Sequence, residues 1–73
     1  PNPSSTEFVL QVNTTNNTDR MLVNIYDVSG KIYKQFKANP TQLIKFGTGM
    51  RPGTYLVEVL QAGHRKTATV IKL

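Results

Sequence analysis

Apolar and polar residues alternate along most of this chain, a period typical of strands rather than helices. In the segment 7–12, the side chains of Phe8, Leu10 and Val12 fall on one face. The same period of two recurs in the segments 21–26, 31–37, 41–46, 55–60 and 64–72. These segments follow one another at roughly ten-residue spacing, which is the pattern of a sandwich or a small barrel. We therefore predict an all-β domain with six clear strands and no helix.

Short polar segments separate the predicted strands. Asp27-Val28-Ser29-Gly30-Lys31 and Ala62-Gly63 have the composition of tight hairpin turns, because glycine readily adopts the positive φ that such turns need. A glycine- and proline-rich loop covers residues 47–53, and an Asn/Thr-rich stretch covers residues 13–19. We expect Phe46 and Tyr55, which lie in strongly alternating strands, to belong to the core.

The length of 73 residues allows one domain with a modest core. The sequence contains no cysteine and a single histidine, so it cannot form a disulfide or a zinc site built from Cys and His. We expect no metal site and no cofactor.

The net charge of +5 raises the question of a nucleic-acid partner. The nine Lys/Arg residues are spread along the chain, which favours lysines that protect strand edges against aggregation. A single-strand binder stays open as one alternative, with salt-sensitive affinity as its test, because several aromatic residues could stack bases beside lysines. These are Tyr26, Tyr33, Phe36, Phe46 and Tyr55, of which Phe46 and Tyr55 are expected in the core. We expect no nucleic-acid partner.

Catalytic chemistry finds few candidate residues. His64 stands beside a predicted turn and next to Arg65 and Lys66, where a solvated surface residue is expected, and no serine lies in a nucleophile-elbow context. Only four carboxylates are present and they are not clustered, so neither a glycosidase pair nor a calcium loop is predicted. Gly47-Thr48-Gly49 is not followed by a helix, which a phosphate loop needs. We expect no enzymatic activity.

The two ends of the chain suggest a larger context. The sequence opens on Pro1-Asn2-Pro3 with neither an initiator Met nor an apolar leader, and no apolar stretch approaches the roughly 20 residues of a membrane span. We therefore expect a piece of a longer protein. Strand character up to Leu73, where most domains fray, suggests that this end is used.

Four motifs in order resemble the C-terminal sorting domain of the Bacteroidetes type IX secretion system. They are Pro1-Asn2-Pro3-Ser4, Val23-Asn24-Ile25-Tyr26-Asp27-Val28-Ser29-Gly30-Lys31, Met50-Arg51-Pro52-Gly53-Thr54-Tyr55-Leu56-Val57, and the segment from Gly63-His64-Arg65-Lys66 to Val70-Ile71-Lys72-Leu73. The resemblance implies an immunoglobulin-like antiparallel sandwich of about seven strands, with residues 1–73 forming a single sorting domain cut from a larger cargo protein.

The resemblance also implies a route. The cargo passes through the periplasm, is recognised by type IX translocon and shuttle proteins, and reaches the cell surface or the medium. A sortase-like surface peptidase then removes the domain, or the cargo is anchored. Independently of the resemblance, the lack of a long apolar stretch predicts no membrane span. Self-association through an open edge strand at residues 64–72 is a further expectation.

By the same resemblance, recognition falls on Gly53, Tyr55, Gly63, Lys66, Val70, Ile71, Lys72 and Leu73. For Gly53, Tyr55 and Gly63 we favour turn geometry and packing over direct contact. We expect Lys72 to lie outside the core, because charged residues are rarely buried. The alternative function is an immunoglobulin-like binding or spacer module for carbohydrate or protein, which would need Tyr26, Tyr33 and Phe36 on one solvent-exposed face.

Overall fold

The computed structural model describes residues 6–12, 14–16, 18–41 and 43–73. These residues form six strands, and none of them is helical. The strands are β1 (Phe8–Leu10), β2 (Met21–Tyr26), β3 (Ile32–Ala38), β4 (Ile44–Phe46), β5 (Gly53–Gln61) and β6 (His64–Lys72). Pro1-Asn2-Pro3-Ser4, the first motif of the resemblance, lies outside the described residues.

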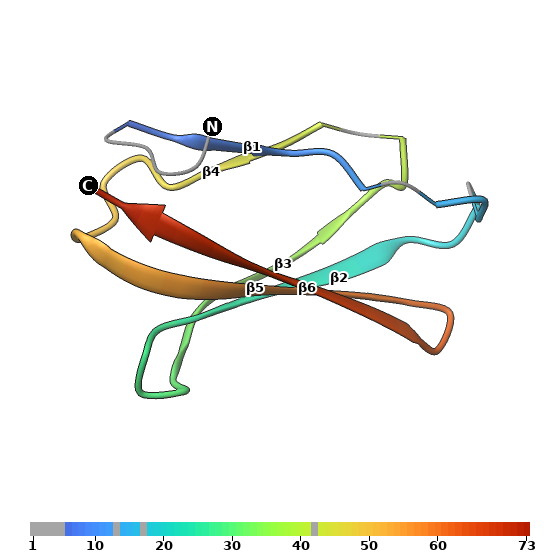
Figure 1. The fold of residues 1–73 in the computed structure, drawn as a ribbon. Helices are drawn as coiled ribbons and strands as arrows, with labels where there is room; N and C mark the ends of the chain where they lie inside the picture. Colours follow the sequence, from blue (N-terminus) through green and yellow to red (C-terminus); the bar gives the residue numbers. More distant parts are fainter. Residues whose placement is uncertain (1–5, 13, 17, 42) are drawn as a thin grey trace.

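The strands form two antiparallel sheets of unequal size. The larger sheet has the order β3-β2-β5-β6, and β1 pairs with β4 in the smaller one. Figure 1 shows β1 and β4 as a short layer lying across the larger sheet. The fold is therefore all-β, as predicted, but its second layer consists of only two three-residue strands.

The core lies between the two layers. Met21, Val23 and Ile25 of β2 are completely buried, and Val57 of β5 is nearly so. Phe8 and Phe46 face them from the small sheet with ring centroids 5.3 Å apart. The buried residues of β2 repeat at every second position, which is why the alternation in the sequence identified the buried face of that strand.

The strand boundaries agree closely with the prediction over the large sheet. The ranges of β2 and β6 are the predicted ones, β3 begins one residue later than predicted, and β5 extends beyond 55–60 at both ends. The first and fourth predicted strands, 7–12 and 41–46, shorten to three residues each. Within the described ranges each of these two strands pairs only with the other, so fewer of their residues are held in a ladder.

Both predicted hairpin turns form. Gly30 has a φ of 86°, and in the second turn Ala62 and Gly63 have φ values of 48° and 81°. In the first turn the Asp27 carboxylate accepts hydrogen bonds from the backbone N–H groups of Ser29 and Lys31, as expected of a turn-forming residue. The Ser29 hydroxyl, 2.6 Å from this carboxylate, is the main reason that the pKa of Asp27 falls below its ordinary value.

Candidate recognition surface

The eight residues predicted to take part in recognition divide into a buried and an exposed group. Tyr55, Val70 and Lys72 are buried, with 6–8% of their surface exposed. The exposed residues are Gly53, Gly63, Lys66, Ile71 and Leu73. They do not form one continuous patch, because Gly53 and Lys72 pair at one end of the β5–β6 ladder while Gly63 lies in the turn at the other end.

The prediction that Lys72 lies outside the core is wrong. Only 6% of this residue is exposed, and its Nζ donates a hydrogen bond to the Gly47 carbonyl oxygen at 2.7 Å and a second one to the Thr6 carbonyl oxygen. Lys72 therefore connects β6 of the large sheet with the loop that follows β4 and the segment that precedes β1. Val70, two residues earlier, points to the same side of the sheet. The alternation along the strand therefore already predicts that the side chain of Lys72 faces the core.

Tyr55 supports the same region from β5. It pairs directly with Val70 of β6, and its hydroxyl donates a hydrogen bond to the Arg51 carbonyl oxygen at 2.9 Å. The ring of Tyr33 meets the ring of Tyr55 edge-on, with centroids 5.7 Å apart. Tyr55 is thus a core residue, as predicted, with its polar end bound to the loop before β5.

Beyond Val70, toward the hairpin turn, the second layer no longer covers β6. All residues from His64 to Thr69 are exposed. On the side facing the second layer, the structure has a cleft that we call the seam cleft. Leu10, Val12 and Thr14 line one wall of it, and Val59, Lys66 and Ala68 line the other. It consists of two adjoining hollows of about 450 and 240 Å³ that share Val12, Val59 and Lys66.

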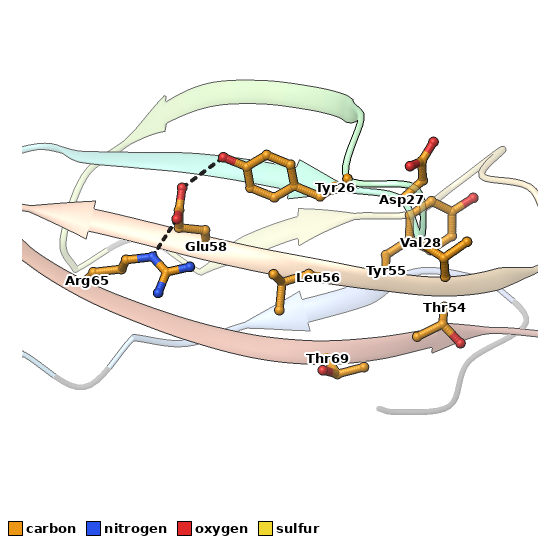
Figure 2. Close-up of a pocket in the computed structure, with 10 residues that line it drawn as sticks. Tyr26, Asp27, Val28, Thr54, Tyr55, Leu56, Glu58, Arg65 and Thr69 are labelled. Carbon is orange, nitrogen blue, oxygen red and sulfur yellow. Dashed lines mark hydrogen bonds and ion pairs between the residues drawn. The ribbon is translucent and has the colours of Figure 1, made fainter.

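The opposite face of the large sheet carries a polar network that crosses all four strands. Gln35 donates to Asn24, and Asn24 donates to the Glu58 carboxylate at 2.9 Å. Tyr26 donates to the same carboxylate oxygen, and Arg65 forms an ion pair with the other oxygen at 2.6 Å. Figure 2 shows Glu58 between Tyr26 and Arg65 in a shallow hollow over β5 and β6. The sequence did not single out this network.

The network changes the acidity of its members. The hydrogen bond from Arg65, and then that from Asn24, lowers the pKa of Glu58. The pKa of Tyr26 is raised, first because its hydroxyl donates to the Glu58 carboxylate. Tyr26, Asn24 and Arg65 all donate to the Glu58 carboxylate. These bonds stabilise its charged form, so Glu58 has a structural role within the sheet.

Other candidate chemistries gain little from the arrangement of the described residues. They contain no group of three His, Asp or Glu side chains that could hold a metal ion. The described residues also include no helix that could cross a membrane. Phe36 packs against the core while Tyr26 belongs to the network on the opposite face, so the aromatic platform that a carbohydrate or nucleic-acid binder would use does not form.

The comparisons with known proteins give one match. The whole of residues 1–73 matches the family model described as secretion system C-terminal sorting domain. No curated protein and no solved structure matches the chain.

Proposed function

This chain belongs to the family of secretion system C-terminal sorting domains, and on that basis we propose where the secretion machinery reads it. Domains of this family are the sorting signals of type IX secretion and are not enzymes, so the chain directs export to the cell surface or the medium in Bacteroidetes. The proposed recognition surface consists of exposed side chains of β6 and of the residue that follows it. These are Lys66, Ile71 and Leu73.

The observation that supports this surface is the contrast between neighbouring residues at the end of β6. Val70 and Lys72 are buried, whereas 42% of Ile71 and 63% of Leu73 are exposed. The buried pair holds the strand against the core, and the pleat then points the two apolar neighbours outward. Two large aliphatic side chains, held in place and accessible, are suited to contact an apolar surface of a partner.

The other predicted residues would act through this arrangement. Tyr55 supports Val70 by direct pairing, and Gly53 lies opposite Lys72 in the ladder. Gly63 allows the positive φ of the hairpin turn that brings β6 back along β5. Loss of any of these residues would displace Ile71 and Leu73 without removing a contact with the partner.

The route that we propose follows from the family. A cargo protein joined to this domain passes through the periplasm, meets the shuttle and translocon proteins there, and crosses the outer membrane. A sortase-like surface peptidase then removes the domain, or the cargo is anchored at the surface. We also propose that the two layers are an immunoglobulin-like sandwich, an arrangement supported by their antiparallel pairing.

A secretion assay tests the proposed surface. Residues 1–73 are fused behind a fluorescent protein that carries a signal peptide and expressed in a Bacteroidetes host with an active type IX system. We expect export of the wild-type fusion and periplasmic retention of Leu73→Glu. The matched control is Val28→Glu, which makes the same kind of change at a residue that is 82% exposed in the β2–β3 turn.

The outcomes separate the two levels of the proposal. Retention of the wild-type fusion would contradict the sorting function itself. Equal export of wild type and Leu73→Glu would leave that function intact and remove Leu73 from the recognition surface. Retention of Val28→Glu as well would show a general sensitivity to surface charge and would also contradict a localised surface.

A further inference from the structure

One side chain joins the two ends of the described chain. Lys72 is the last residue of β6, and its Nζ donates hydrogen bonds to the carbonyl oxygens of Thr6 and Gly47, the second at 2.7 Å. Thr6 lies 66 positions away in the sequence, shortly before β1. We call Thr6 and Glu7 the entry segment. A single ammonium group therefore connects the end of β6 with the segment that leads into β1.

Gly47 extends this contact into the small sheet. An added Cβ at Gly47 would lie 2.8 Å from the Phe8 ring, so its backbone fits directly against the first residue of β1. Lys72 is only 6% exposed, and an ammonium group that is buried without acceptors costs free energy. If the end of β6 moves away from the core, the ammonium loses both carbonyl groups together, and the entry segment loses its bond to Lys72.

The end of β6 is a unit that can open by itself. Only the last three ladder pairs, which join residues 53–55 to residues 70–72, lie at this end. Local opening of such a terminal segment costs less free energy than unfolding of the whole domain. Ile71 and Leu73, the exposed apolar side chains of the proposed recognition surface, belong to the same end. Recognition and the bond to the entry segment thus meet within four residues of the chain.

We propose that Lys72 is a latch between the two ends of the domain: when the end of β6 leaves the core, the entry segment is released and becomes accessible to proteolysis. The inference rests on the proposed sorting function and adds a regulatory step to it. A partner that binds the open end of β6 more tightly than the closed one shifts the domain toward the released state. Recognition at this end would then expose the segment through which a cargo is joined to the domain.

Two glutamates make release of the entry segment measurable in the purified chain. A glutamate-specific protease can cut only after Glu7, in the entry segment, and after Glu58, in the middle of β5. The first cut needs local release, because Phe8 on its other side is buried, whereas the second needs β5 to leave the sheet. When the protease is slow relative to reclosing, each rate follows the population of the open form. Mass spectrometry of the fragments gives both rates in one sample.

Two variants of β6 open the latch in different ways. Lys72→Met removes the ammonium, and we expect the cut after Glu7 to become about tenfold faster, the effect of one lost charged hydrogen bond. Val70→Thr keeps the ammonium but places a hydroxyl group in the core under the end of β6. We expect it to speed the same cut about fivefold, although it alters no group that bonds to Thr6.

Asn24→Ala is the control for a general loss of stability. Asn24 is buried on the opposite face of the large sheet, where it donates to Glu58 and accepts from Gln35. Its removal weakens the sheet without a change in the second layer. We expect a faster cut after Glu58, and a cut after Glu7 that stays within about twofold of the wild-type rate.

The outcomes distinguish the latch from the sorting function. If Lys72→Met or Val70→Thr leaves the cut after Glu7 at the wild-type rate, the latch is overturned and the sorting function stands. A cut after Glu7 that rises together with the cut after Glu58 in Asn24→Ala would show that the entry segment opens only with the whole domain, and would equally overturn it. Retention of the wild-type fusion in the export assay would instead remove the sorting function, and with it the role of the latch.

Discussion

The buried ammonium of Lys72 makes the clearest prediction about stability. Lys72→Met keeps most of the aliphatic volume and removes the donor to the carbonyl oxygens of Gly47 and Thr6. A hydrogen bond from a charged group contributes about 1.5–3 kcal/mol. Thr6 is exposed, so water replaces the ammonium at its carbonyl, and the Gly47 carbonyl keeps its bond from the Met50 N–H. We therefore expect the loss of about one such bond, or about 2 kcal/mol.

This loss is large for so small a domain. A core of this size supplies about 3–5 kcal/mol of stability, so Lys72→Met should lose about half of it and shift the folded-to-unfolded ratio about 30-fold. Urea denaturation followed by circular dichroism measures the free energy of unfolding, with an unchanged dependence on denaturant. Lys37→Met is the control, because Lys37 is exposed on β3, and we expect a change below about 0.5 kcal/mol. Equal changes in the two variants would refute the reasoning that Lys72 holds the layers together.

Three further changes test neighbouring parts of the structure. Gly47→Ala should cost about 3 kcal/mol, because φ is 105° and the new Cβ would lie 2.8 Å from the Phe8 ring, whereas Gly49→Ala, with φ at 80° and open space, should cost only about 1–2; equal thermal melts would contradict the clash. The lowered pKa of Glu58 stabilises the fold above the ordinary pKa of glutamate, about 4.3, and this contribution disappears as the pH falls through the lower pKa of the folded state. The difference in unfolding free energy between wild type and Glu58→Gln should thus shrink between pH 7 and pH 3, and a constant difference would argue against it. Tyr55→Phe should lose about 1 kcal/mol with its hydroxyl hydrogen bond, measured by urea denaturation, and an unchanged midpoint would show that this bond contributes nothing.

The alternation of residues predicted the large sheet well because burial on one face fixes the period of each strand. The ranges of β2 and β6 follow directly from it, and so does the burial of Tyr55. The short pairing of β1 with β4 could not be predicted, because it joins residues 34 to 38 positions apart and depends on how the second layer crosses the first. The alternation of residues predicts the length of a strand and its buried face, but not the strand with which it pairs.

The two charged residues that matter most to the structure show a different limit. Lys72 follows Val70 by two residues, so the alternation along β6 places both side chains on the buried face. The prediction that Lys72 lies outside the core gave more weight to its charge than to its position. Glu58 stands among alternating apolar residues opposite Asn24 on the outer face, but that pairing depends on the register between β2 and β5. A single sequence shows which residues of a strand share a face. The register between two strands is fixed only when the core is packed.

The division of β6 into two halves explains how one strand can serve both stability and recognition. From Val70 to Lys72 the strand is held by the core and by two backbone carbonyl groups of the second layer. From His64 to Thr69 all of its residues are exposed. Continuing the second layer over Ala68 would bury more apolar surface, which a small domain needs, but it would also close the seam cleft. Substitutions at Val70 and Lys72 should therefore lower export together with stability, whereas Lys66→Glu should lower export in a domain that remains as stable as the wild type.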